Sequence, residues 1–167
     1  MKKVIVIGCP GSGKTTFSEK LSKKTGLPLY YLDAIWHKPD RTHISRDEFD
    51  VRLSGIFAKD EWIIDGNYAA TFEQRLVECD TVILFDLPTE VCLEGAVKRL
   101  GISRPDMPWF DTELDPVFKK SIETFSTHII PYIYETIDRY GSDKEIVVFK
   151  TREETDAFLE KLEKRGE

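Results

Sequence analysis

The stretch that decides the fold is "VIVIGCPGSGKT", residues 4–15. Its first four residues are apolar and β-branched, which predicts a short buried strand. The remainder matches the pattern GxxxxGK[ST] in full and leads into a stretch with helical periodicity. Such a loop turns successive backbone N–H groups toward phosphate oxygens, and the helix behind it adds a favourable dipole. We therefore expect a nucleotide-binding P-loop.

The residue types in this loop predict separate roles. Lys14 can reach the β- and γ-phosphates of a nucleotide, and Thr15 can supply a hydroxyl to Mg²⁺. A P-loop alone does not distinguish a motor, a switch and a small-molecule kinase. The residues expected to bind the nucleotide are Gly8, Pro10, Gly11, Ser12, Gly13, Lys14, Thr15 and Thr16.

Composition narrows the range of partners. The 167 residues suit one domain, 1–167, and the net charge of −6 leaves no basic surplus for a nucleic-acid backbone or an anionic membrane. We expect a small-molecule partner and disfavour direct nucleic-acid binding, although a local basic patch would fit this balance. Three widely spaced cysteines and the lack of a long apolar run predict a cytoplasmic protein without a membrane partner, as a monomer or homodimer.

Short apolar runs alternate with stretches of helical periodicity, which is the pattern of parallel βαβ units in an α/β fold. The predicted strands are residues 4–7, 29–32, 62–64, 81–85 and 145–149. The predicted helices are residues 14–25, 46–58, 70–78, 89–100, 116–140 and 152–165.

One segment, "GISRPDMPWFDTELDP" (residues 101–116), breaks this alternation because it holds three prolines and has no clean period. A connection of this length in a compact domain is typical of a lid or binding loop, and a packed surface loop is the alternative. We expect it to lie near the functional site.

Three aspartates follow predicted strands and should lie at the carboxyl edge of the sheet, where open α/β sheets bind ligands. Asp65, before Gly66, is the preferred carboxylate for a Mg²⁺-bound water, and an Asp-Gly turn without a metal is the alternative. Asp86 is the second choice for that role, and a helix cap is the favoured interpretation of it. Asp33 and the nearby Trp36 indicate an acceptor site, with a capping aspartate and a core tryptophan as the alternatives.

The motifs taken together resemble those of a known family. The P-loop, "YLDAIW" (31–36), "WIIDGNY" (62–68), "VILFDLP" (82–88) and "KRLGISRPDM" (98–107) are similar to segments of the DNA topology modulation proteins, which are P-loop proteins related to adenylate kinase. The resemblance covers roughly residues 3–135. It implies a nucleoside-monophosphate-kinase-like α/β/α fold with a five-stranded parallel sheet in the order 2-3-1-4-5. It also implies ATP as the nucleotide, an acceptor-side segment at 33–60 and a lid-like loop at 99–116.

The same resemblance assigns roles to residues. Arg99 and Arg104 look like lid arginines that clamp phosphate oxygens, with a solvated helix end as the alternative. Arg75 reaches an anionic acceptor or makes a surface ion pair, and residues 150–152 form part of an adenine pocket or a helix cap. The resemblance implies that the catalytic residues are Lys14, Asp33, Arg99 and Arg104, and that Arg99 also binds the nucleotide. The residues that it implies for binding of the acceptor are Asp33, Trp36, Asp65, Gly66, Tyr68 and Arg75. Those that it implies for binding of the metal are Thr15 and Asp65.

Two departures from the family bear on function. Similar proteins tend to carry arginines where this chain has Gly95 and Ile130, so fewer cations would stabilise a transferring phosphoryl group. The leading hypothesis is an ATP- and Mg²⁺-dependent phosphotransferase that acts on a nucleoside, a nucleotide or a small hydroxyl metabolite. The alternative is a nucleotide-dependent regulatory or binding protein linked to DNA topology, with weak or no kinase activity. A guanine-reading switch is disfavoured because no NKxD-like segment occurs.

Overall fold

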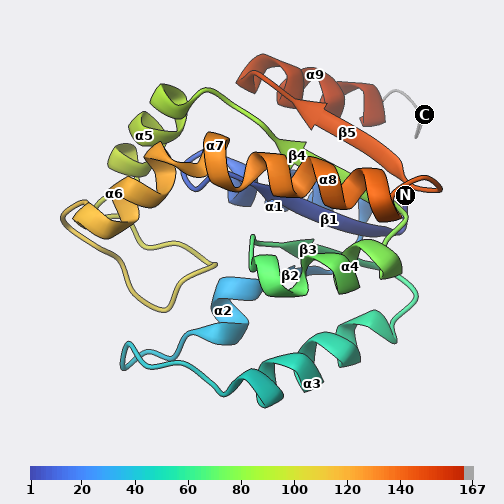
Figure 1. Cartoon of the computed structure of the whole chain (residues 1–167), viewed down its shortest axis with the longest axis horizontal. Coiled ribbons are helices and arrows are strands. Elements are labelled where there is room, and N and C mark those ends of the chain that lie inside the picture. The colour runs from blue at the N-terminus through green and yellow to red at the C-terminus, as the bar shows by residue number, and fades with distance from the viewer. Residues whose placement is uncertain (164–167) are drawn as a thin grey trace.

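The computed structural model, which describes residues 1–163, is built on a five-stranded parallel β-sheet (Figure 1). The strands lie in the order β2-β3-β1-β4-β5, which confirms the predicted order and the α/β class. Their bounds are Lys3–Gly8 (β1), Leu29–Tyr31 (β2), Trp62–Asp65 (β3), Thr81–Phe85 (β4) and Glu145–Phe149 (β5).

The central strand is β1, and its burial explains its composition. Val4, Ile5 and Val6 have no exposed surface, because β3 and β4 flank the strand and helices cover both faces of the sheet. The register places Val6 beside Asp65 of β3 and Gly8 beside Phe85 of β4. The end of β1 and its following loop therefore emerge between two neighbouring strand ends.

Helices form a layer on each side of the sheet. Helix α1 (Lys14–Thr25) packs against α9 (Arg152–Glu163), and α4 (Phe72–Glu78) packs against α8 (Ile130–Tyr140). Figure 1 shows α4 and α8 in front of the sheet and α1 behind it. The predicted three-layer α/β/α arrangement is confirmed. Helix α5 (Thr89–Lys98) follows β4 and lies against the P-loop.

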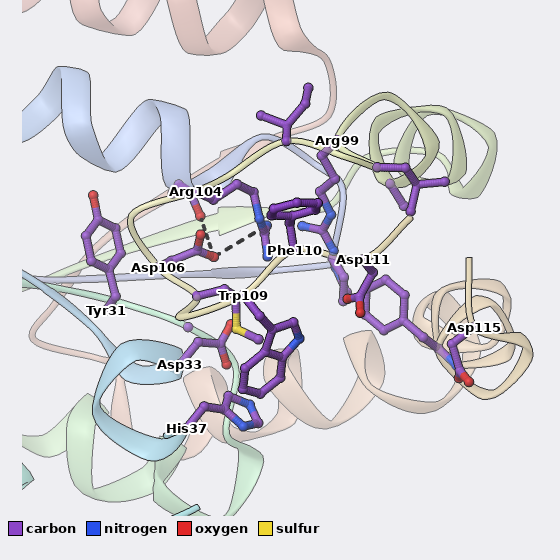
Figure 2. Close-up of a pocket in the computed structure, with 18 of the residues that line it drawn as sticks. Tyr31, Asp33, His37, Arg99, Arg104, Asp106, Trp109, Phe110, Asp111 and Asp115 are labelled. Carbon is purple, nitrogen blue, oxygen red and sulfur yellow. Dashed lines mark hydrogen bonds and ion pairs between the residues drawn. The ribbon is translucent and has the colours of Figure 1, made fainter. Parts of the chain in front are cut away.

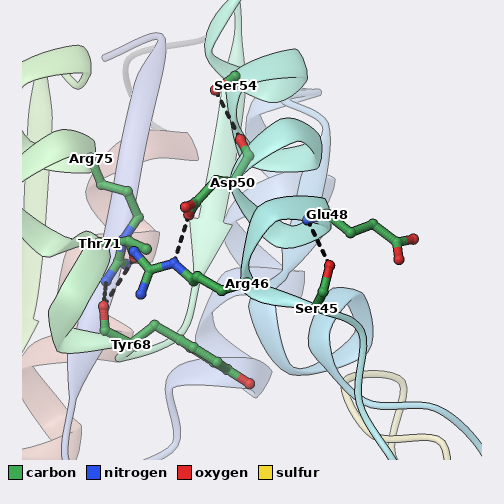
Figure 3. Close-up of polar contacts among 8 residues, drawn as sticks. All are labelled: Ser45, Arg46, Glu48, Asp50, Ser54, Tyr68, Thr71 and Arg75. Atoms are coloured by element: carbon green, nitrogen blue, oxygen red, sulfur yellow. Dashed lines mark hydrogen bonds and ion pairs between the residues drawn. The ribbon is translucent and has the colours of Figure 1, made fainter.

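The acceptor-side segment contains a short helix that the sequence reading missed. Helix α2 (Leu32–Trp36) begins directly after β2, so Leu32 is helical instead of the last strand residue. Helix α3 (Arg46–Phe57) starts where predicted, because the Ser45 side chain accepts a hydrogen bond from the Glu48 N–H at 3.1 Å (Figure 3). The predicted helix at 70–78 begins as a 3-10 turn, Ala69–Thr71, before α4.

The predicted long helix at 116–140 is wrong, because the chain forms three helices there. These are α6 (Pro116–Glu123), α7 (Phe125–His128) and α8. Pro131 lies in the first turn of α8, where its missing N–H costs nothing, whereas inside a continuous helix it would remove a hydrogen bond and clash with the preceding turn. Apolar periodicity continues across these breaks, which is why it did not reveal them. Within residues 1–163 no helix is long and apolar enough to cross a membrane.

A close approach between α5 and the P-loop generates a testable prediction. A β-carbon at Gly95 would lie 1.9 Å from the carbonyl oxygen of Gly11, so alanine there forces two backbones apart. We expect Gly95→Ala to lower the free energy of unfolding by about 1–3 kcal/mol, as overpacking does. Thermal unfolding followed by circular dichroism measures this.

Gly55, in α3, provides the matched control. A β-carbon there meets no atom within 4 Å, so Gly55→Ala gains helix propensity without a clash. It should raise the free energy of unfolding by about 0.5–1 kcal/mol. Equal effects of the two substitutions would contradict the close packing of α5 on the P-loop.

Candidate functional site

A cavity of about 530 Å³ lies at the carboxyl edge of the sheet. Its wall is formed by the P-loop, the ends of β2 and β3, helix α2 and the lid-like loop, which are distant in sequence (Figure 2). The lid-like loop runs across the cavity between the end of α5 and the start of α6. The cavity is lined by nine of the predicted site residues, namely Pro10, Lys14, Thr15, Asp33, Asp65, Gly66, Tyr68, Arg99 and Arg104.

The P-loop has the backbone shape that phosphate binding requires. Gly11 and Gly13 have φ angles of 81° and 100°, the left-handed region that side chains avoid. A β-carbon at Gly11 would also lie 2.0 Å from the Cys92 carbonyl oxygen. The loop is therefore a concave cradle that fits the phosphates of a nucleotide. Thr16 is exposed on α1 and does not line the cavity.

Lys14 extends along the loop toward the cavity. Its ammonium donates a hydrogen bond to the Cys9 carbonyl at 3.0 Å. Burial lowers the pKa of Lys14, and the Asp65 carboxylate opposes this shift. A nucleotide phosphate would give this partly desolvated cation a stronger, charge-assisted partner than a neutral carbonyl.

Carboxylate oxygens lie near the hydroxyl of Thr15. Asp65 is 4% exposed, and burial raises its pKa to about 7, while Lys14 and a hydrogen bond from Thr15 lower it. Asp106 of the lid-like loop accepts from the Thr15 hydroxyl at 3.4 Å. Within residues 1–163 no three His, Cys, Asp or Glu side chains form a metal cluster. Mg²⁺ commonly binds one or two carboxylates and takes its other ligands from phosphates and water.

The acceptor-side wall contains a hydrogen-bonded pair, Asp33 and Tyr68. The Tyr68 hydroxyl donates to Asp33 Oδ1 at 2.7 Å, and burial together with the Asp33 charge raises the pKa of Tyr68, which keeps it a donor. Figure 2 shows the Asp33 carboxylate directed into the cavity from α2. Its Oδ1 is engaged, so Oδ2 is the oxygen left to face a ligand.

Arg75 does not line the cavity, and both interpretations made from the sequence are wrong. Its side chain is fully buried, and burial lowers its pKa to about 10. It donates to the carbonyls of Gly66 at 2.8 Å, of Asn67, and of Tyr68 at 3.2 Å, and to the Thr71 hydroxyl at 3.1 Å (Figure 3). Arg75 therefore braces the loop at 66–68 from behind.

This brace supports strained backbone at Tyr68. Its φ of 38° is left-handed, a conformation that costs a non-glycine residue about 1–3 kcal/mol and persists only where neighbours enforce it. The adjacent Asn67 accepts a hydrogen bond from the Gly8 N–H at 3.1 Å. One loop thus contacts both the start of the P-loop and the acceptor-side carboxylate.

Trp36 does not line the cavity either, which favours the core interpretation over the acceptor role. Its indole stacks on His43 with ring centroids 4.4 Å apart and meets Phe49 and Tyr68 edge-on. Trp36 supports Tyr68 from outside the cavity. The aromatic rings that do reach the cavity include His37, Tyr68, Trp109 and Phe118.

The two predicted lid arginines both line the cavity. Arg99 ends α5 and lies 5.3 Å above the Phe118 ring, and burial and the Arg104 charge lower its pKa. Arg104 is 3.4 Å from Asp106. Two guanidiniums of like charge that face one cavity suit an anionic ligand with several oxygens.

Asp86 belongs to a different site from the cavity. It accepts from the Tyr134 hydroxyl at 2.9 Å and pairs with Lys150, so it neither faces the P-loop threonine nor caps α5, whose cap is Pro88. Arg152 donates to the Gly11 carbonyl at 3.2 Å on the outer side of the P-loop. Thr151 accepts from the Glu154 N–H at 3.3 Å, which fits the helix-cap interpretation.

Packing accounts for the residues at the two positions where arginines were expected, Gly95 and Ile130. Gly95 lies against the Gly11 carbonyl, and the Arg152 guanidinium occupies the neighbouring space. Ile130 is 9% exposed and belongs to the core. Neither position faces the cavity, so Arg99 and Arg104 carry the cationic charge of the lid-like side.

Four residues that line the cavity, Arg41, Asn67, Asp106 and Trp109, were not predicted from the sequence. Asn67 lies within the quoted "DGNY" and Asp106 within "RPDM", so a polar side chain inside a recognised motif was the available signal. Arg41 and Trp109 gave no such signal, because their contact joins two loops: the Arg41 guanidinium lies 5.1 Å above the Trp109 ring and 3.4 Å from Asp111.

Comparisons with known proteins support a kinase-like fold. No protein-family model and no curated protein matches this chain. Among solved structures it is similar to a shikimate kinase from Bacteroides thetaiotaomicron, with 15% identity, a TM-score of 0.55 and 96% of each chain covered. It is also similar to a shikimate kinase from Acinetobacter baumannii in complex with shikimate, with 14% identity, a TM-score of 0.64, and 98% of this chain and 92% of that chain covered. At this identity the similarity shows the fold alone, which is a shikimate kinase-like P-loop fold.

The Arg75 brace makes a stability prediction. Arg75→Met fills the same space but leaves three carbonyls without their donor, so the free energy of unfolding should fall by about 3 kcal/mol or more. Urea unfolding measures it. Arg139→Met is the control, because Arg139 is exposed and pairs with Glu135 on the surface of α8, so this substitution should lower the free energy of unfolding by less than about 0.5 kcal/mol. A loss below about 1 kcal/mol at Arg75 would show that its hydrogen bonds do not hold the loop.

Proposed function

We propose that this protein is an ATP- and Mg²⁺-dependent phosphotransferase that moves the γ-phosphate to a hydroxyl group of a small acceptor. One observation carries the proposal: a single cavity is lined by the P-loop Lys14 and Thr15, the acceptor-side Asp33 and the two lid-like arginines. Phosphoryl transfer requires a loop that binds the phosphates of the donor nucleotide, a group that accepts the proton of the acceptor hydroxyl, and cations that bind the transferring phosphoryl group, all around one cavity.

Each residue has a stated task in the reaction. Asp33 orients the acceptor hydroxyl and takes its proton as the new oxygen–phosphorus bond forms and the bond to the leaving ADP oxygen breaks. Tyr68 fixes the Asp33 carboxylate by donating to Oδ1 at 2.7 Å. Lys14, Arg99 and Arg104 offset the charge on the transferring group. Mg²⁺, held through Thr15 and Asp65, supplies further charge neutralisation at the phosphates when bound.

The acceptor class follows from the wall opposite the P-loop. This wall combines the Asp33 carboxylate with the rings of His37, Tyr68 and Trp109. It suits a hydroxyl-bearing metabolite with a planar or ring-shaped body, such as a nucleoside, a nucleotide or a cyclic hydroxy acid. The resemblance to the DNA topology modulation proteins rests on sequence motifs and stays a prediction.

The alternative function, a nucleotide-dependent binding protein with weak or no turnover, is favoured by one observation. Gly95 and Ile130 replace arginines and are packed away from the cavity, which leaves a reduced set of cations. ATP binding without acceptor-dependent ADP release would support this alternative.

A panel assay tests the proposal. ADP release is followed with nucleosides, nucleotides, sugars, and shikimate and related hydroxy acids as acceptors. At least one of these acceptors should raise the rate of ADP release well above the rate measured without an acceptor. If a nucleotide binds and no acceptor stimulates ADP release, the proposal of a phosphotransferase is wrong.

With the acceptor identified, Asp33→Asn tests the proton acceptor. The amide retains an oxygen for Tyr68 but is a poor base, so turnover should fall about 10²- to 10⁴-fold while affinity for a non-hydrolysable ATP analogue is unchanged. Asp40→Asn is the control, because Asp40 is an exposed carboxylate on the same segment, bonded only locally to Thr42, and its loss should leave turnover within twofold. Equal effects of the two substitutions would remove Asp33 from the mechanism.

A further inference from the structure

The lid-like loop places one carboxylate, that of Asp106, inside the protein. Its side chain is 8% exposed, and it approaches the Thr15 hydroxyl of the P-loop, 91 residues away in sequence. Figure 2 shows the Asp106 carboxylate beside Arg104, with a dashed line that joins the two side chains. The exposed acidic residues of the same loop, such as Asp111 and Glu113, differ from it in this respect.

The contacts of Asp106 leave the hydrogen-bonding capacity of its carboxylate partly unused. Oδ2 is 3.4 Å from the Thr15 hydroxyl and 3.4 Å from Arg104, which are long for charge-assisted contacts. Oδ1 is buried and has no hydrogen-bond partner within residues 1–163. A buried carboxylate with a free oxygen is costly, so it needs a partner that the protein itself does not provide.

A second buried carboxylate shares this corner. Asp65 lines the same cavity as Thr15 and Asp106, and the Asp106 charge raises the pKa of Asp65, as expected of like charges. Two carboxylates and a hydroxyl thus converge, and the positive charges that act on the two carboxylates come from Lys14, Arg99 and Arg104. A hard divalent cation prefers this set of oxygen donors.

We propose that Asp106 is a metal ligand contributed by the lid-like loop, so that Mg²⁺ joins Thr15 and Asp65 of the P-loop side to Asp106. The proposal rests on the proposed function, because it assigns a further residue to the same nucleotide and metal site. Its consequence is that metal binding holds the lid-like loop against the P-loop, where Asp106 already approaches Thr15. Arg104, two residues before Asp106, is then positioned toward the transferring phosphate.

Mn²⁺, which can be detected by electron paramagnetic resonance, is the probe. The affinity of Mn²⁺ is measured with a saturating non-hydrolysable ATP analogue for the wild type, Asp106→Asn and the control Glu113→Gln, an exposed carboxyl on the same loop. Asp106→Asn should weaken Mn²⁺ binding at least tenfold, while Glu113→Gln should change it less than twofold. Unchanged or tighter binding in Asp106→Asn would overturn the proposal, since tighter binding would mean that Asp106 competes with the metal.

A second measurement needs no substitution. Fe²⁺ in place of Mg²⁺, with ascorbate and the same analogue, cleaves backbone next to its ligands, and the wild type should be cut near residues 15, 65 and 106. Cuts near 15 and 65 without cleavage in the lid-like loop would refute the role of Asp106. These results are distinguishable from failure of the proposed function, which would show as nucleotide binding to the wild type without release of ADP stimulated by any acceptor.

Discussion

The structure of this site depends on one buried guanidinium. Arg75 donates to the carbonyls of Gly66, Asn67 and Tyr68, and no carboxylate neutralises it among those hydrogen-bond partners. The loop it holds bonds Gly8 through Asn67 and Asp33 through Tyr68. The P-loop and the cavity wall that contains Asp33 come from different βα units, and they are therefore kept in register by a residue that does not line the cavity. The left-handed backbone at Tyr68 shows that this arrangement is enforced by its surroundings.

Several charged side chains that are incompletely paired face the same cavity. Burial lowers the pKa of Lys14 and raises that of Asp65, Arg99 lies beside Arg104, and Asp106 has an unpartnered oxygen within the described residues. Each of these groups is only partly satisfied by the protein. A nucleotide with its metal would supply anionic oxygens to the cations and a cation to the carboxylates, so ligand binding and charge compensation are the same event. This also explains why the charges converge from three separate loops.

The similarity to shikimate kinases at 14–15% identity concerns backbone architecture. The proposed phosphotransferase activity rests instead on which side chains share the cavity, because one P-loop fold can serve many reactions. The lid-like loop forms a large part of the cavity wall. It contributes a cation, a buried carboxylate and aromatic rings, and it contacts the acceptor-side segment through Arg41, Trp109 and Asp111. Substrate choice is expected to reside in those side chains.

The sequence by itself determined the sheet, the P-loop and nine of the residues that line the cavity. These depend on local rules: strand and helix periodicity, glycine conformations, and the meeting of parallel strand ends at one edge. Only the tertiary structure decided the burial and contacts of Arg75, Trp36 and Asp106, and it divided the predicted helix at 116–140. The physical reason is that burial and hydrogen-bond partners depend on residues that are distant in sequence. An arginine after "DGNY" could equally bind a ligand, form an ion pair or support a loop, until packing shows which carbonyls surround it.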